Sequence, residues 1–350
     1  MNKFFISCLL AVLLFIVPVA AFVALEAGNL ENERRRISAF PEMPSKLRTG
    51  HIKRYFQGID AFFADQFPLR SSLLALSVAF HEAMNSDLDI DKCYQGKKNW
   101  LFLGNDWARC VDKLVGRIIL SGDRLHQQAE AYEKIRDAAE KCGAAFFIFI
   151  GPDKSTIYPE YLPPLVVPAQ RRFIAPLVDS LNESEVLVYD PAKRLIEAKS
   201  AGSLLYYKTD THWNARGAHE AFAGFTEWAG LPPLPSLSFA DGPEKRGDLV
   251  GIGGYKSFPL SVGDNFTLQW SAPQDIRWEG NGLIRNAHAA SNKTAWIFGD
   301  SFAIALQPYV IAEFREARFY GQSVFEPALE ELFPKPDVII WVITERNFAH

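Results

Sequence analysis

The chain has 350 residues, of which 48% are hydrophobic and 22% are charged, so it can form one large domain or two small ones around a well-buried core. Its formal net charge of −4 provides no basic surface for nucleic acid. The dense basic run Arg34-Arg35-Arg36 lies beside Glu31 and Glu33, which indicates a solvated or juxtamembrane face. We therefore expect a globular protein that does not bind nucleic acid.

The N-terminal segment differs in composition from the rest of the chain. Residues 4–25 carry no charge, and about 20 apolar residues are enough to cross a bilayer as a helix. Lys3 on the short N-terminal side predicts a cytoplasmic N-terminus and an exported remainder. We expect residues 1–27 to form an uncleaved signal anchor. The alternative is a signal peptide, cleaved after the small residues Val19-Ala20-Ala21.

Residues 28–90 are expected to connect this anchor to the main domain, residues 91–350. Residues 28–48 are polar and contain Pro41 and Pro44, which is typical of a stalk. Residues 50–85 show apolar positions spaced by three or four, which predicts a small helical preface.

The cysteines fit an exported domain but do not define a disulfide framework. Cys93, Cys110 and Cys142 follow the N-terminal segment, and an odd number leaves at least one thiol unpaired in an oxidising compartment. A bridge between Cys93 and Cys110 and three unpaired thiols both remain open. The spacing does not suggest structural zinc.

From about residue 90, short apolar runs alternate with helical stretches, which is typical of an α/β fold with a largely parallel sheet. In chain order we expect a strand at 100–103, a helix at 125–141, a strand at 144–150, a helix at 171–181, a strand at 186–189, a helix at 192–199, a helix from about 214 to 230, a strand at 294–298, a helix after 301, and strands at 317–320 and 338–343. Residues 231–292 are rich in Pro, Gly, Ser and Asn and are predicted to form loops with a few short strands, where substrate-contacting insertions are expected.

Ser301 lies where a predicted strand turns into a helix, and Gly299 can supply the tight backbone there. At a helix N-terminus, backbone N–H groups and the positive end of the helix can stabilise a developing oxyanion. The same position suits a helix cap, which is the better explanation of Ser301 when it is considered alone.

Asp210 and His212 favour the catalytic interpretation. They are two residues apart in a polar loop, so the carboxylate can orient the imidazole as a general base for a serine. Two alternatives are a capping segment before Asn214 and a metal site, for which His219 is a candidate third ligand.

Together these motifs resemble the SGNH hydrolase-like domain of the AlgX/AlgJ family, whose members are exported polysaccharide O-acetyltransferases. The resemblance covers roughly residues 95–348 and rests on the segments 98–103, 151–160, 209–214, 246–249, 299–302 and 344–347. It implies Ser301 as nucleophile, His212 as base and Asp210 as orienting acid, with no cofactor or metal. Because Asp and His precede Ser, it also implies a circularly permuted SGNH hydrolase-like α/β fold, with a mostly parallel sheet flanked by helices.

The sequence resembles the AlgJ branch in particular, because it lacks the C-terminal carbohydrate-binding module that AlgX-like members carry. This branch is anchored in the inner membrane by its N-terminal helix and faces the periplasm. The resemblance implies an exopolysaccharide acceptor and a multipass membrane O-acyltransferase that supplies acetyl groups.

Further residues are candidates for substrate binding. Lys154 and Tyr158 follow one predicted strand end, and Glu345 and Arg346 follow another, at the sheet edge where open α/β folds bind ligands. Structural ion pairs or caps would explain them as well. Trp213, with Tyr206 and Tyr207, could stack on a sugar ring, although ordinary packing also explains aromatic residues in this chain.

Three functions follow from these observations. The first is transfer of acetyl groups to an exported polysaccharide such as alginate. The second is an acetylesterase with the same catalytic residues, in which water replaces the sugar. The third is a catalytically inactive subunit of an export complex.

Overall fold

The computed structural model describes residues 55, 91–255, 258–279, 282–321 and 335–349. The expected anchor over residues 1–27 and the stalk and preface over residues 28–90 lie outside these residues, apart from Tyr55. Contacts divide the chain into two units, Met1–Leu88 with Gly251–Phe258 and Asp89–Val250 with Pro259–His350. The second unit carries the sheet described below. None of the helices in the described ranges is long and apolar enough to cross a membrane.

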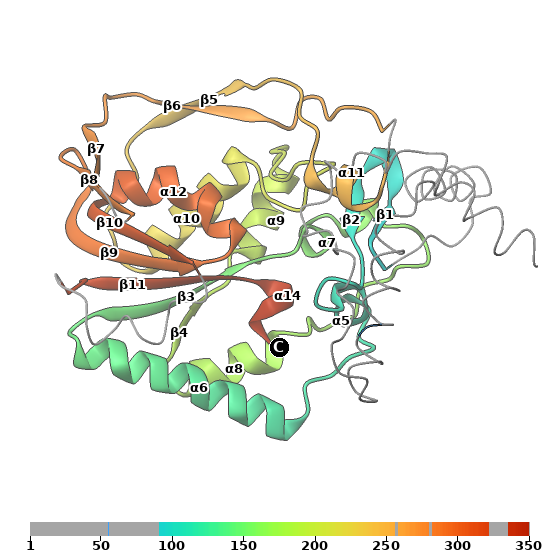
Figure 1. The fold of residues 1–350 in the computed structure, drawn as a ribbon, viewed down its shortest axis with the longest axis horizontal. Helices are drawn as coiled ribbons and strands as arrows, with labels where there is room; N and C mark the ends of the chain where they lie inside the picture. The colour runs from blue at the N-terminus through green and yellow to red at the C-terminus, as the bar shows by residue number, and fades with distance from the viewer. Residues whose placement is uncertain (1–54, 56–90, 256–257, 280–281, 322–334, 350) are drawn as a thin grey trace, which may run out of the picture. The chain divides into compact units, whose positions relative to one another are not determined.

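A seven-stranded sheet in the order β4-β3-β11-β9-β10-β8-β7 forms the centre of this unit (Figure 1). The strands β4, β3, β11, β9 and β10 run parallel to one another. The apolar segments predicted as strands from the sequence fall within these strands. Such segments could be recognised because a strand covered on both faces is largely hydrophobic along its length. The bounds are β3 Ala145–Gly151, β4 Leu187–Tyr189, β7 Ile276–Glu279, β8 Leu283–Asn286, β9 Ser291–Gly299, β10 Phe314–Gly321 and β11 Val338–Thr344.

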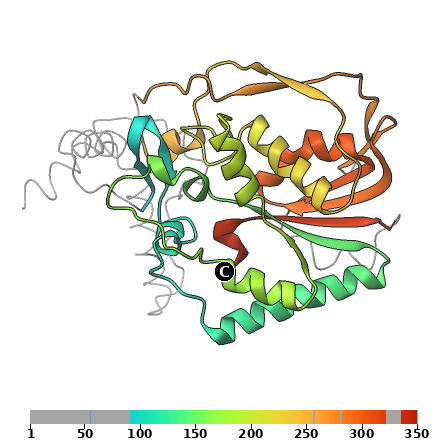
Figure 2. The ribbon, with the colours of Figure 1, turned by 180° about the vertical axis from the view of Figure 1, so that it is seen from behind.

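Helices cover both faces of this sheet. The helices α6 and α8 lie on one face, and α9, α10 and α12 lie on the other (Figures 1 and 2). The Ser121 side chain caps α6 by accepting from the Arg124 N–H, and Gly143 follows the helix with a left-handed φ of 81°. The bounds are α6 Gly122–Lys141, α8 Ala175–Glu183, α9 Ala192–Ser200, α10 Ala215–Trp228 and α12 Ser301–Glu313.

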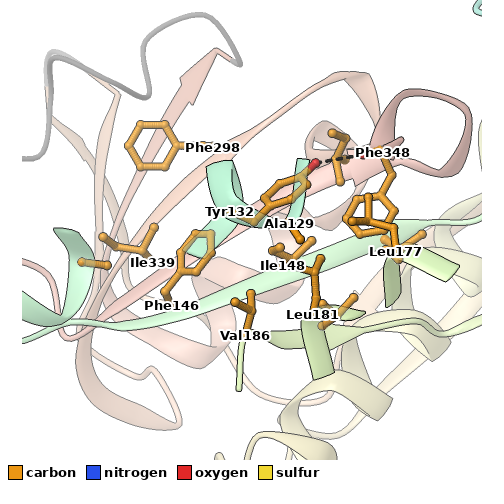
Figure 3. Packing of buried hydrophobic residues seen from close by; sticks show 14 of the residues in the cluster. Ala129, Tyr132, Phe146, Ile148, Leu177, Leu181, Val186, Phe298, Ile339 and Phe348 are labelled. Atoms are coloured by element: carbon orange, nitrogen blue, oxygen red, sulfur yellow. Dashed lines mark hydrogen bonds between the residues drawn. The ribbon is translucent and has the colours of Figure 1, made fainter. Parts of the chain in front are cut away.

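Apolar side chains fill the space between the sheet and both helix layers. On the α6 and α8 side, Ile148 and Leu177 are fully buried, and the Tyr132 hydroxyl donates to the Phe348 carbonyl at 3.0 Å (Figure 3). On the other side, Phe149 of β3 packs against Phe225 of α10, with ring centroids 5.4 Å apart. The loops at the ends of these strands therefore extend from a sheet that is packed on both faces.

The sheet is mixed, which corrects the mostly parallel sheet expected from the sequence. The strands β8 and β7 add an antiparallel edge to β10. The strand β7 has only four residues and all of them are exposed, so its alternation of apolar and polar residues is too short to predict a strand within a loop-rich stretch.

Two further ribbons lie outside the main sheet. The strand expected at 100–103 pairs with β1 in a separate antiparallel ribbon, and β5 pairs with β6 in another. The remaining bounds are β1 Cys93–Gln95, β2 Leu101–Leu103, α5 Cys110–Leu114, α7 Lys154–Ile157, β5 Leu237–Asp241, α11 Asp248–Ile252, β6 Phe266–Trp270 and α14 Glu345–Phe348, with short 3-10 helices η2 Lys97–Asn99 and η3 Pro159–Tyr161.

None of the three cysteines of the described region forms a disulfide, so the Cys93–Cys110 bridge considered from the sequence is not present. Cys93 is buried, and the Cys110 thiol donates to the carbonyls of Leu103 and Gly104 at 3.2 and 3.1 Å. Burial raises the pKa of both Cys93 and Cys110 to about 12, so neither is a reactive thiolate.

Candidate active site

Asp210 and His212 form a hydrogen-bonded pair in the loop before α10. An isolated bridge between Tyr206 and Trp213 closes this loop. The Asp210 Oδ1 atom lies 2.6 Å from His212 Nδ1 and accepts from the His212 backbone N–H at 3.1 Å. We assign the imidazole proton to Nδ1, because that nitrogen faces the carboxylate. His212 Nε2 has no hydrogen-bond partner among the described residues, so it is available as a base.

The environment of Asp210 keeps its carboxyl group ionised. Burial opposes ionisation, but the hydrogen bond and charge of His212 and the ammonium of Lys245 outweigh it and lower the pKa of Asp210 below its usual range. The Lys245 Nζ atom lies 3.3 Å from Asp210 Oδ2. An ionised carboxylate at this position can stabilise the imidazolium that forms when His212 takes a proton.

Ser301 is the first residue of α12 and is exposed. The turn before it is fixed by Asp300, whose Oδ1 accepts from the Phe302 N–H at 2.9 Å. The other oxygen of Asp300 accepts from the Thr344 N–H at 3.0 Å, which ties the helix start to the end of β11. Asp300, and not Ser301, is therefore the N-cap, so the serine hydroxyl is not used as a helix cap.

Gly299 is needed for close packing before this turn. A Cβ atom at Gly299 would lie 2.7 Å from the Ala303 Cβ and 2.9 Å from the Val342 carbonyl oxygen. Its φ is not in the left-handed region, so the expected tight turn does not depend on glycine's special backbone freedom. Gly299 instead lets β9 approach β11 and α12.

The position of Phe302 shows that Ser301 and His212 lie in the same region. Phe302 follows Ser301 directly, and its ring centroid lies 5.2 Å from that of His212. Ser301 and His212 themselves share no hydrogen bond in this structure. Catalytic hydrogen bonds are often long in unliganded enzymes and shorten when substrate binds, so this geometry is compatible with a serine and its base.

Asp248 is a site residue that the sequence reasoning did not assign. Its Oδ1 accepts from the Thr211 N–H at 2.8 Å, and its Oδ2 accepts from the Thr211 hydroxyl at 2.7 Å. Asp248 lies in the segment 246–249, which contributed to the family resemblance. It was not recognised as part of the site because it belongs to a loop-rich stretch and contacts a residue 37 positions away.

Asp210, His212 and Asp248 each offer one atom within 4.8 Å of the others, so this trio could hold a metal ion. The hydrogen bonds among these residues, Thr211 and Lys245 also explain why they lie close together. His219, the third ligand considered from the sequence, is not in this group. It lies 3.6 Å from a carboxylate oxygen of Glu220.

The predicted substrate residues Lys154, Tyr158 and Trp213 are all buried. The Lys154 ammonium donates to the carbonyls of residues 207, 208 and 210, so it holds the backbone of the loop that carries Asp210 and His212. The Tyr158 hydroxyl accepts from the Leu205 N–H at 2.9 Å. The ring of Trp213 packs on that of Phe302, with ring centroids 4.8 Å apart. These contacts support the loop and leave no open face for stacking on a sugar.

The neighbouring aromatic residues Tyr206 and Tyr207 differ in exposure. Tyr206 is buried, and its hydroxyl donates to the Pro152 carbonyl at 2.7 Å. Tyr207 is partly exposed and carries the Lys245 ammonium 3.8 Å above its ring.

Glu345 and Arg346 belong to an ion network at the ends of β3 and β11. Glu345 is buried and accepts from Arg172, from the Thr156 hydroxyl and from the Asp153 N–H. Arg346 pairs with Asp153 at 2.5 Å. The structure thus brings Asp210, His212 and Ser301 to one region, whereas the five expected substrate residues serve mainly to support the fold around it.

Comparison with known proteins agrees with the fold. Residues 93–227 match the family model described as an SGNH hydrolase-like domain of acetyltransferase AlgX. No curated protein matches the sequence.

Solved structures share the architecture at low sequence identity. The O-acetyltransferase domain of Pseudomonas putida AlgJ is 18% identical, with 74% of this chain and 92% of that chain covered and a TM-score of 0.50. PatB1 of Bacillus cereus is 12% identical, with 74% and 98% covered and a TM-score of 0.53. A DHHW family protein of Eubacterium siraeum is 15% identical, with 75% and 91% covered and a TM-score of 0.52.

The family match covers β1 to α10, including the loop of Asp210 and His212, and the fold agreement extends over about three quarters of the chain. Over residues 93–227 the sequence is therefore similar to the SGNH hydrolase-like domain of acetyltransferase AlgX, and the solved structures share its fold.

Proposed function

We propose that the protein transfers acetyl groups to hydroxyls of an exported polysaccharide, with Ser301 as nucleophile, His212 as base and Asp210 as the orienting acid. The observation that carries this proposal is the 2.6 Å pair of Asp210 and His212 beside the start of α12, with His212 Nε2 unpartnered. The family description as an acetyltransferase supports acyl transfer.

The reaction has two halves with the same chemistry. His212 Nε2 takes the proton of the Ser301 hydroxyl while Oγ attacks the acetyl carbonyl of the donor. The bond to the donor's leaving group then breaks, and the imidazolium protonates that group. In the second half, His212 takes a proton from a sugar hydroxyl, whose oxygen attacks the acetyl-serine. The bond to Ser301 Oγ breaks, and this oxygen takes the proton back.

Both halves pass through an oxyanion. Ser301 lies at the first position of α12, where the leading N–H groups of a helix lack intrahelical acceptors and the helix dipole is positive. The serine backbone N–H is therefore a candidate oxyanion donor. A donor aimed at the developing charge contributes about 10²- to 10³-fold to turnover.

The expected cellular setting remains part of this proposal. Residues 1–27 would anchor the protein in the inner membrane with the domain in the periplasm, and a multipass membrane O-acyltransferase would supply the acetyl groups. The neighbouring solved structure that is described as an O-acetyltransferase domain, AlgJ of Pseudomonas putida, supports a transferase with this fold.

The test is to incubate the purified protein with p-nitrophenyl acetate and oligosaccharides and to detect acetylated sugar by mass spectrometry. We expect acetylated product from the wild type, and none from Ser301→Ala. Ser236→Ala, which changes an exposed serine, is the matched control and should retain activity. Acetate release without acetylated sugar would show an esterase. Product formation by Ser301→Ala would reject Ser301 as nucleophile.

A further inference from the structure

We propose that Asp248, acting through the Thr211 hydroxyl, is a second carboxylate that positions His212 and stabilises its protonated form. The proposal rests on the proposed role of His212 as the general base. It assigns functions to two residues outside the Asp210, His212 and Ser301 set.

The hydrogen bonds define a direction from Asp248 to His212. The Thr211 hydroxyl gives its proton to Asp248 Oδ2 at 2.7 Å, so its oxygen is left as an acceptor. That oxygen lies 3.1 Å from His212 Nδ1. The Nδ1–H group therefore faces two acceptors, Asp210 Oδ1 at 2.6 Å and Thr211 Oγ1 at 3.1 Å.

The charges around the imidazole explain why a second carboxylate, Asp248, would help to stabilise protonated His212. The Asp210 carboxylate is shared, because Lys245 Nζ lies 3.3 Å from its other oxygen. A second ammonium, that of Lys154, donates to the backbone carbonyl of Asp210 at 2.7 Å. These two cations oppose a positive charge on His212. Asp248 Oδ2 lies 3.7 Å from His212 Nδ1 and favours that charge. From α12, the imidazole is faced by the uncharged ring of Phe302.

The backbone around Asp248 is built for close approach to the catalytic loop. A Cβ atom at Gly247 would lie 2.0 Å from the Thr209 carbonyl oxygen, so this position has no room for a side chain. The Gly247 N–H donates to the Thr209 hydroxyl at 3.1 Å, and the Asp248 N–H donates to Asp210 Oδ2 at 3.3 Å. Two carboxylates are thereby held on one imidazole by separate segments of the chain.

The test compares Thr211→Val, which removes the hydroxyl at nearly constant volume, with Thr211→Ser, which retains it, and with Asp248→Asn. Hydrolysis of p-nitrophenyl acetate is measured as kcat and KM across pH. We expect Thr211→Val and Asp248→Asn to lower kcat about tenfold or more with little change in KM, whereas Thr211→Ser stays close to wild type.

The pH profile separates positioning from general structural support. Removing a carboxylate makes the imidazolium less stable, so the acidic limb of kcat/KM in Asp248→Asn should move to lower pH by about half a unit or more. Thermal unfolding checks that each variant is folded. If Asp248→Asn does not fold, Thr211→Val still tests the proposal, because it removes the hydroxyl that links Asp248 to His212.

Two results would overturn the proposal. One is a folded Thr211→Val or Asp248→Asn protein with the wild-type kcat and pH profile. The other is a rise in KM alone, which would indicate substrate contact. If Ser301→Ala retained the wild-type rate, the proposed function itself would fail. This failure can be distinguished from failure of the present proposal, because the variant leaves Thr211 and Asp248 unchanged.

Discussion

The buried ammonium of Lys154 donates to three carbonyls of the loop that carries Asp210 and His212. Burial lowers the pKa of Lys154 to about 8, although nearby carboxylates such as Asp210 oppose this shift. A charged side chain at a strand end was expected from the sequence to contact substrate. The Lys154 side chain instead fixes the backbone that carries Asp210. A sequence pattern cannot distinguish this supporting role from ligand binding.

We predict that Lys154→Met lowers kcat by about tenfold or more and leaves KM nearly unchanged, because a misplaced orienting carboxylate weakens the base. The measurement is steady-state hydrolysis of p-nitrophenyl acetate, with thermal unfolding as the check on folding. A rise in KM at unchanged kcat would restore Lys154 as a substrate contact.

Asp210 is expected to be essential for the correct orientation and protonation of His212. Asp210→Asn should lower kcat roughly 10³- to 10⁴-fold, by analogy with the loss seen when the acid of a serine protease triad becomes an amide. The amide also carries no negative charge, so it cannot stabilise the imidazolium of His212. A loss below tenfold, measured in the same assay, would mean that Asp248 alone can orient the histidine.

At the scale of elements, the turn from β9 to α12, the loop before α10 and the start of α11 determine the site. Strands such as β3 and β11 could be predicted because their runs are continuously apolar. The pair of Asp210 and His212 could also be predicted, because it is local in the sequence. The contact of Asp248 with Thr211 could not, since it joins two loops through tertiary packing.

We predict that Gly247→Ala reduces activity strongly, because the added Cβ would meet the Thr209 carbonyl oxygen and push the segment carrying Asp248 away from the catalytic loop. Gly122→Ala is the matched control. Its Cβ would meet no atom within 4 Å, so activity and unfolding temperature should stay near or slightly above wild type. Equal activity of the two variants would contradict the close packing inferred at Gly247.

At the scale of the whole molecule, Glu313 is a buried carboxyl group at the end of α12 with no hydrogen-bond partner among the described residues. Burial raises the pKa of Glu313 to about 8, against the opposing effect of Lys293. In the unfolded chain the group ionises near pH 4.3. The folded state therefore binds an extra proton between these values, and stability should fall as pH rises from about 4 to about 8.

We predict that Glu313→Gln raises the unfolding temperature at pH 8 to 9, because the wild type must either bury the Glu313 charge or take up a proton when it folds at this pH. This advantage should fade towards pH 5, where Glu313 is neutral in the folded protein. Glu197→Gln, which changes an exposed glutamate on α9, should show no such dependence. Parallel curves for Glu313→Gln and wild type across this pH range would contradict the prediction.

The position of β11 has a consequence for the order in which the protein becomes active. This strand comes last along the described chain, yet it lies between β3 and β9, and its Thr344 N–H holds Asp300 beside the nucleophile. The halves of the sheet cannot join until residues 338–344 have been made and have inserted between them. The proposed acyl transfer would therefore require synthesis of the chain through Thr344, and fragments that stop short of it should be inactive even though they contain Asp210, His212 and Ser301.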